Sequence, residues 1–143
     1  MTDSMARAAL GKGSLFSQAT GDDLDDVLES AEEVSFEAGQ IIFEQGDQRD
    51  GMFVILEGEV QIDVGGRFHR LRAGEFFGEM ALLVPDARLA TVRAMDPVRA
   101  LHVSSGAFES FLLEHPRVAI GMLRALSLRL REVEQRIDAW MAP

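Results

Sequence analysis

Between residues 34 and 103 the chain consists of short apolar runs separated by glycines, and this pattern restricts its possible folds more than any other feature. The runs are Ile41–Phe43, Met52–Leu56, Val60–Val64, Phe68–Leu71, Thr91–Met95 and Val98–Val103. Glu59–Val64 alternates with period two, which is typical of a half-buried strand. No helical period separates the runs. The pattern therefore favours an antiparallel barrel or double-sheet jelly roll over an alternating α/β sheet.

A short helix is predicted before this strand-rich segment. Thr20 followed by Asp23 matches a helix N-cap with an acidic third position, and carboxylates there favour the positive end of the helix dipole. The apolar stripe of this helix is Leu24, Val27, Leu28 and Ala31. The residues ahead of it mix small and polar side chains, so 1–14 are predicted to be a flexible tail.

Two helices are predicted after the strands. The first carries Phe108 and Phe111 and ends at His115, because Pro116 disfavours helical geometry in the residue before it and suits the first turn of a new helix. The second helix carries an apolar stripe at steps of three and four: Leu123, Leu126, Leu130, Val133, Ile137 and Trp140. Such a stripe packs on the chain's own strands or forms a two-fold coiled-coil interface. The two readings are compatible.

Charge and composition argue against several classes of function. With 24 Asp plus Glu against 14 Lys plus Arg, the net charge is −10, which disfavours binding to nucleic acid or to an anionic membrane. The sequence has no cysteine, no signal-peptide core and no apolar run long enough to span a membrane. We therefore expect a cytoplasmic chain that forms one domain with a substantial core.

Neither catalysis nor metal binding is indicated. Ser, His and Asp residues are scattered without the pattern of a nucleophile and its base. The histidines His69, His102 and His115 stand apart, unlike the closely spaced ligands of a metal site. We expect a protein that is not an enzyme and that holds no cofactor and no metal.

One segment does carry chemistry, namely Gly74–Leu83 followed by Arg88–Val92. A glycine-led turn that opens a helix after Gly78 would present free backbone N–H groups to an anion. Arg88 could bind a phosphate through paired donors. Glu79 would repel a phosphate and is better explained as an acceptor for sugar hydroxyl groups. The plainer alternative is a loop in which Arg88 only neutralises Glu79.

The sequence resembles the cyclic nucleotide-binding domains of catabolite activator-type regulators, cAMP-dependent protein kinase regulatory subunits and nucleotide-gated channels. The resemblance covers about residues 15–140 and lies in the runs Phe36–Asp47 and Met52–Val60 and in the phosphate-binding cassette Phe77–Val92. It implies one domain at 15–143: a jelly-roll β-roll, or double-stranded β-helix, at about 34–103, with an N-terminal helix, a cassette helix, and B and C helices at about 105–141.

The resemblance also implies a role for each cassette residue. Arg88 would pair with the cyclic phosphate, and Glu79 would accept a hydrogen bond from the ribose 2′-hydroxyl. The remaining phosphate contacts would come from the backbone around Gly78, Met80, Ala81, Leu89 and Ala90. The ligand would be cAMP or cGMP.

The base would be enclosed by the strands and the last helix. The resemblance implies that Ile62 and Phe68 form the apolar wall against the purine. The face of the C-terminal helix near Arg129, Val133 and Arg136 closes over it as a lid.

One departure from the family concerns the residue after the cassette arginine. Many members carry Ser, Thr or Ala there, and a hydroxyl contacts the phosphate or a guanine amino group, whereas this chain has Leu89. The missing hydroxyl implies a preference for cAMP over cGMP. It also leaves an alternative function, in which the domain is degenerate, has lost nucleotide binding and acts as an interaction or dimerisation module.

The output implied by the resemblance is movement of the C-terminal helices. No helix-turn-helix follows the last helix in this sequence, so we expect the signal to reach an unknown protein effector, or a homodimer formed through Leu123, Leu126, Leu130, Val133 and Ile137. A regulatory fragment of a longer protein is the other alternative.

Overall fold

The computed structural model describes residues 19–47, 51–79 and 90–141, with side chains in the last helix as far as Ile137. Its elements are α2 (Gly21–Ser30), β1 (Glu32–Phe36), β2 (Ile41–Phe43), β3 (Met52–Glu57), β4 (Val60–Val64), β5 (Arg67–Leu71), β6 (Phe76–Phe77), β7 (Thr91–Ala94), β8 (Val98–Val103), α4 (Ser105–Glu114) and α5 (Pro116–Met141). The tail predicted for 1–14 and the predicted cassette helix lie outside the described residues.

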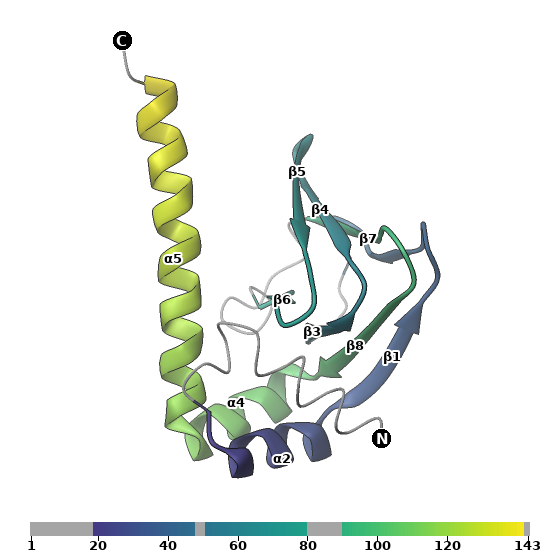
Figure 1. Ribbon diagram of the computed structural model, residues 1–143, viewed down its shortest axis with the longest axis vertical. Helices are drawn as coiled ribbons and strands as arrows, with labels where there is room; N and C mark the ends of the chain where they lie inside the picture. Colours follow the sequence, from purple (N-terminus) through teal and green to yellow (C-terminus); the bar gives the residue numbers. More distant parts are fainter. Residues whose placement is uncertain (1–18, 48–50, 80–89, 142–143) are drawn as a thin grey trace.

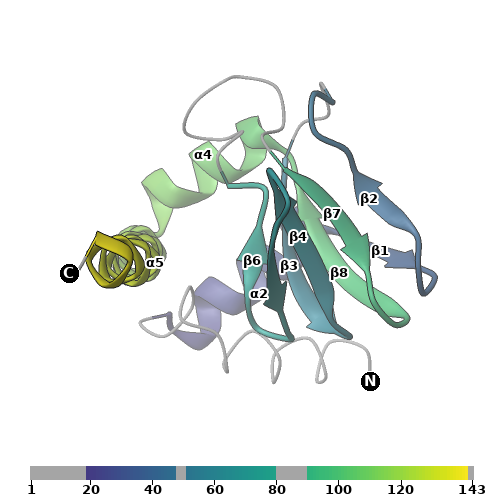
Figure 2. The same ribbon diagram turned by 90° about the horizontal axis from the view of Figure 1, so that it is seen from above.

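The described strands form two antiparallel sheets of four strands each. Their orders are β1-β8-β3-β6 and β2-β7-β4-β5. Figures 1 and 2 show both sheets in one roll, with α2 and α4 below one end and α5 alongside. The predicted jelly-roll β-roll, with a helix before it and two helices after it, is confirmed.

β3 shows why some strands of the roll lack polar alternation. Successive side chains of a strand point to opposite faces. Phe53 and Ile55 pack in the core between the two sheets, whereas Met52, Val54 and Leu56 pack in a second core with α2, α4 and α5. Helices therefore cover the outer face of this sheet, and β3 is buried on both faces.

The hairpin between β4 and β5 is set by two glycines. Gly65 and Gly66 have φ angles of 58° and 85°. A two-residue turn with positive φ at both positions is the usual tight connection between antiparallel strands. It pairs Val64 with Arg67, and from there the register runs along both strands.

α2 begins with the predicted cap. The Thr20 hydroxyl accepts a hydrogen bond from the Asp23 N–H at 3.3 Å, and Asp23 accepts one from the Thr20 N–H at 2.8 Å. This reciprocal arrangement confirms the predicted capping box. Val27 is fully buried beneath the helix, while the partly buried Leu24, Leu28 and Ala31 pack on the same core.

α5 presents two different apolar faces. Val118, Met122 and Ala125 are buried in the core shared with the sheet and the other helices. The predicted stripe lies on a neighbouring face, where the residues exposed by 44 to 65% are Leu123, Leu130, Val133 and Ile137. Leu126, between the two faces, is partly buried against the core. The structure therefore contradicts the reading in which the whole stripe packs on the chain's own strands.

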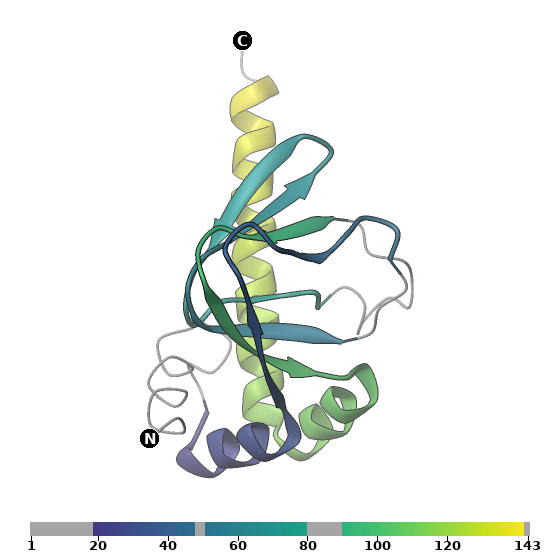
Figure 3. The same ribbon diagram turned by 90° about the vertical axis from the view of Figure 1, so that its right-hand side faces the viewer.

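α5 is also the longest helix of the described part. Figures 1 and 3 show it running from α4 along one side of the roll and past the tip of the β4–β5 hairpin. None of the helices described in 19–47, 51–79 and 90–141 is long and apolar enough to cross a membrane.

Candidate functional site

Glu79 is a buried carboxylate at the point where β6 leads into the cassette. β6 is held in place by antiparallel pairing with β3. Gly78 follows with a φ of 85°, a conformation that favours glycine, and turns the chain out of the strand. Glu79 is 9% exposed. A carboxylate at this depth needs a hydrogen-bonding partner to remain charged.

Arg129 of α5 supplies that partner. Its Nη1 donates to Oε1 of Glu79 at 2.9 Å, and its Nη2 donates to the main-chain carbonyl of Phe76 at 2.6 Å. The guanidinium also lies over the Phe76 ring, 4.1 Å from the centroid, at a distance typical of a cation–π contact. Arg129 therefore joins α5 to the end of β6 and to Glu79 near the start of the cassette.

The ion pair between Glu79 and Arg129 was not predicted. Both residues were predicted to face the ligand, but 50 positions separate them and no period of the sequence links them. The available signal was general: a carboxylate next to a buried strand has to find a cation, and the C-terminal helix is rich in arginine.

A groove of about 570 Å³ separates α5 from the β4–β5 hairpin. Val64, Arg67 and His69 line it on the strands, and Val133, Arg136 and Ile137 line it on α5. Nη1 of Arg136 and Nε2 of His69 approach each other across it to 3.4 Å. The groove is open and largely apolar, with its polar groups on opposite sides.

The groove and Glu79 lie on the same side of α5. Arg129, Val133 and Arg136 follow one another at spacings of four and three, which places them on one helix face. The first contacts Glu79 and the other two line the groove. The face predicted as the lid is thus turned toward the roll.

The register of the hairpin separates the two residues predicted to form the apolar wall. Ile62 pairs with His69, and Phe68 pairs with Asp63. Directly opposed residues share a face and the next pair along takes the other face. Ile62 therefore shares the face of His69 toward the groove and packs on the inner core. Phe68 lies on the opposite face and is 60% exposed.

Phe68 therefore does not share with Ile62 the face of the hairpin that a common wall would require. The family resemblance implied this wall, and the implication was drawn without the register of the hairpin. The two-residue turn Gly65–Gly66 carried the missing information, since it sets the register and with it the face of every side chain on β5.

The other predicted site residues flank or fall within the segment that is not described. Gly78 and Glu79 precede it, and the half-buried Ala90 follows it, just before β7. Met80, Ala81, Arg88 and Leu89 lie outside the described residues. In the described part, no cluster of three or more His, Asp or Glu side chains could hold a metal ion.

Comparison with protein families identifies one domain. A family model described as the cyclic nucleotide-binding domain matches residues 33–115. The match begins in β1 and ends at the residue between α4 and α5, so it includes both sheets of the roll.

Individual relatives place this domain within longer proteins. A cGMP-dependent protein kinase of Caenorhabditis briggsae is 28% identical over 139 residues, which are 94% of this chain and 19% of the kinase. A CRP-like cAMP-activated global transcriptional regulator of Mycobacterium tuberculosis is 27% identical over 110 residues, which are 73% of this chain and 49% of the regulator. The chain spans about half or less of the length of these relatives.

A solved structure shows the same fold. The crystal structure of the Thermus thermophilus catabolite activator protein aligns with a TM-score of 0.79 at 27% identity, covering 90% of this chain and 63% of that protein.

Proposed function

This chain belongs to the cyclic nucleotide-binding domain family, and from that premise we propose that it binds cAMP in preference to cGMP and signals through its C-terminal helices to a protein partner. Family membership makes it a cyclic nucleotide-binding regulatory domain. The nucleotide and the mechanism are our proposal. The observation that supports them best is the buried carboxylate of Glu79, held from α5 by Arg129.

Glu79 is suited to bind the ribose. An ionised carboxylate has two oxygens and about four acceptor positions, and the contact from Arg129 uses one of its oxygens. A sugar hydroxyl can therefore donate to Glu79 without displacing Arg129. Hydrogen bonds to a buried charged acceptor are among the stronger ones, so this contact can select a ribose with a free 2′-hydroxyl.

The phosphate is assigned to the segment between Glu79 and Ala90. We propose that the guanidinium of Arg88 binds the cyclic phosphate through paired donors. Backbone N–H groups around Gly78, Met80, Ala81, Leu89 and Ala90 complete the cradle. The chain carries a net charge of −10, so this local set of donors has to supply the attraction.

The purine is assigned to the groove between the β4–β5 hairpin and α5. Val64 on β4 and Val133 on α5 supply apolar surface on its two sides, and Ile62 shares the face of β4 on which Val64 lies. Arg129 precedes Val133 by one helical turn, about 5–6 Å along the axis. The ribose contact and the base groove are therefore neighbours, as the two parts of one nucleoside require.

Signalling follows from the double role of Glu79. A ligand shifts an equilibrium between two helix arrangements only if it interacts differently with each of them. A ribose bound to Glu79 changes the charge and the hydrogen bonds around the same carboxylate that holds Arg129. The position of α5 is therefore sensitive to occupancy of the site.

The preference for cAMP is inferred from Leu89. A leucine side chain has no hydroxyl to offer to the amino group of guanine or to the phosphate. The names of the two relatives compared above point to different nucleotides, cGMP for the kinase and cAMP for the regulator. The proposed preference for cAMP is therefore inferred from Leu89 and not from the names of the relatives.

Self-association through α5 is the second part of the proposal. Leu123 and Leu130 are exposed by 65% and 58%, and the apolar stripe that they begin continues through Val133 and Ile137, which also line the groove. Such surfaces commonly mark contacts with a partner, and steps of three and four suit the facing helix of a second copy. The alternative that we keep is a degenerate domain that dimerises without binding nucleotide.

Calorimetric titration with cAMP, cGMP and 2′-deoxy-cAMP tests the ligand. We expect cAMP to bind more tightly than cGMP. In the wild-type protein, loss of the 2′-hydroxyl should weaken binding by roughly 10-fold or more, because a hydrogen bond to a charged group is lost. In the Glu79→Gln variant the ratio of the dissociation constants of 2′-deoxy-cAMP and cAMP should be severalfold smaller than in wild type. The four measurements form a double-mutant cycle for the contact between Glu79 and the 2′-hydroxyl. Absence of heat with millimolar cAMP and cGMP would instead support the degenerate alternative.

A further inference from the structure

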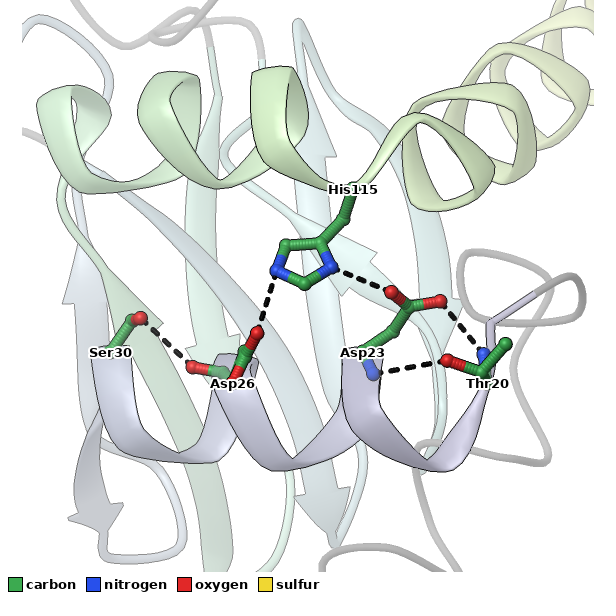
Figure 4. Close-up of polar contacts among 5 residues, drawn as sticks. All are labelled: Thr20, Asp23, Asp26, Ser30 and His115. Atoms are coloured by element: carbon green, nitrogen blue, oxygen red, sulfur yellow. Dashed lines mark hydrogen bonds and ion pairs between the residues drawn. The ribbon is translucent and has the colours of Figure 1, made fainter.

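His115 lies at the corner where α4 ends and α5 begins, and both nitrogens of its ring contact carboxylates of α2 (Figure 4). Nδ1 lies 2.6 Å from Oδ1 of Asp23, and Nε2 lies 2.9 Å from Oδ2 of Asp26. The side chain of His115 is 12% exposed, and the Phe111 ring stacks on it at 4.4 Å between centroids. The imidazole therefore bridges two segments far apart in the sequence.

The backbone of His115 belongs to both C-terminal helices. Its N–H donates to the carbonyl of Phe111 at 2.9 Å and closes α4, while its carbonyl accepts from the N–H of Val118 at 3.0 Å in the first turn of α5. The ring is attached to this junction by a single methylene group. A change in its contacts with α2 consequently acts on the relative placement of all three helices.

The two contacts of the ring require both of its protons. A neutral imidazole has one N–H and one acceptor nitrogen, whereas the imidazolium has two N–H groups. Asp23 and Asp26 offer oxygen acceptors at both nitrogens, so only the imidazolium satisfies both. In the neutral ring one nitrogen lone pair would face a carboxylate oxygen without a hydrogen between them.

Asp23 remains charged over the range in which a histidine titrates. Burial on its own would raise the pKa of Asp23, but the hydrogen bonds from the backbone of Thr20, from His115 and from the Thr20 side chain outweigh it and hold this pKa below its ordinary value. The same carboxylate serves the capping box through Oδ2 and the histidine through Oδ1.

Among the described residues, the other charged groups near the ring are mainly acidic. A cavity of about 400 Å³ beside it is lined by Asp26 and Glu29 from α2 and by Glu114 from α4. On the α5 side, Arg117 in the first turn is exposed. Asp26 is half exposed at 50%, so its carboxylate can return to water when it no longer contacts the ring.

We propose that His115 is a proton-dependent clasp: its protonated ring binds α2 to the corner between α4 and α5, and loss of the Nε2 proton releases Asp26 and loosens α2. Histidine is the side chain suited to such a change between about pH 5 and 8. The clasp itself requires no nucleotide. If α4 and α5 move when nucleotide binds, as the proposed function holds, the clasp also makes that movement dependent on pH. Only this last consequence rests on the proposed function.

Nuclear magnetic resonance of the histidine side chains tests the protonation state directly. In wild-type protein at pH 5.5, long-range ¹H–¹⁵N spectra should show the His115 ring with protons on both nitrogens, and near pH 8.5 they should show it with a proton on Nδ1 only. The spectrum of His115→Asn identifies the signals by their loss. A His115 ring that is neutral at pH 5.5 overturns the proposal.

Unfolding in urea at pH 5.5 and pH 8.5 tests the energetic role. Asp26→Asn should raise the equilibrium constant for unfolding about 3- to 10-fold at pH 5.5, because a partly buried ion pair is lost, and less than about 2-fold at pH 8.5. The control is Glu109→Gln, which removes the same charge from an exposed position on α4. Equal effects of the two variants at both pH values overturn the clasp. His115→Asn keeps a side-chain donor for Asp23 but cannot titrate. Its free energy of unfolding should therefore lie closer to that of wild type at pH 8.5 than at pH 5.5.

Discussion

Arg129 and Glu79 form an ion pair of 2.9 Å that ties the long C-terminal helix to the start of the cassette. Glu79 is the residue that we assign to the ribose. The helix that is proposed to move and the sugar that is proposed to move it therefore act on one carboxylate. Coupling between ligand and helix then needs no chain of intermediate residues, which makes it accessible to single substitutions.

Replacing Arg129 should destabilise the fold. Arg129→Ala leaves the carboxylate of Glu79 and the carbonyl of Phe76 without the donors they have now. We expect a loss of about 1–3 kcal/mol in the free energy of unfolding, measured in urea. Arg124→Ala, an exposed arginine on the same helix, is the control and should change stability by less than about 0.5 kcal/mol. Equal losses would show that the ion pair contributes nothing.

Replacing Arg88 should weaken nucleotide binding. Arg88→Ala removes the paired donors proposed for the cyclic phosphate and should cost roughly 2–5 kcal/mol of binding free energy, much of it from leaving a buried charge without a partner. Calorimetry with cAMP measures the change. Arg72→Ala removes an equal charge from an exposed loop position and should bind like wild type. An unchanged affinity in Arg88→Ala contradicts the assigned role.

Binding should depend on Val133 and not on Phe68. Val133 lines the groove assigned to the base, whereas the register of β5 places Phe68 on the opposite face. Val133→Asp should weaken cAMP binding at least about 10-fold, because a charge would be desolvated against the purine. Phe68→Ala should leave the dissociation constant within about 2-fold of wild type, since exposed positions away from a site contribute little. If Phe68→Ala weakened binding and Val133→Asp did not, the base would instead lie on the outer face of the hairpin.

The apolar stripe on α5 is tested at positions that the fold itself does not need. Leu123 and Leu130 are exposed by 65% and 58%, so a double change to Glu spares the core, whereas Leu126 packs on the core and is unsuitable. Sedimentation velocity should show the double variant as a monomer and wild type as a dimer. Leu128→Glu, exposed by 48% and about half a helical turn away from the stripe, should leave the dimer intact. Wild-type protein that sediments as a monomer contradicts the interface.

The free energy of unfolding should depend on pH through the ionisation of Asp23. Its pKa in the folded protein lies below the ordinary value of 3.8, so the unfolded chain binds more protons in this range and stability falls as the pH decreases through the folded pKa. Asp23→Asn should lose about 0.5–2 kcal/mol at pH 7, typical of a damaged helix cap, and the difference from wild type should shrink below pH 4. Asp22→Asn, on the exposed side of the same turn, serves as the control. A difference that is constant from pH 7 to pH 3 contradicts the assignment.

Local patterns were sufficient for most of the secondary structure. The cap at Thr20, the break at His115–Pro116 and the turn at Gly65–Gly66 each depend on residues within a few positions of one another. Their chemistry therefore acts in the same way in any fold. The resemblance assigned Phe68 to the same wall as Ile62 without the register, although the turn that sets the register was visible in the sequence.

The sequence by itself determined the antiparallel strands and their flanking helices, because period and caps are local properties of the chain. The choice of a β-roll and the residues assigned to a cyclic nucleotide followed from the resemblance to a family. The tertiary structure alone decided that Arg129 reaches Glu79, that His115 reaches Asp23 and Asp26, and which face of α5 remains exposed. Each of these outcomes depends on the angle at which a helix packs on the roll. That angle is set by the summed packing of the buried core, and no short stretch of sequence contains it.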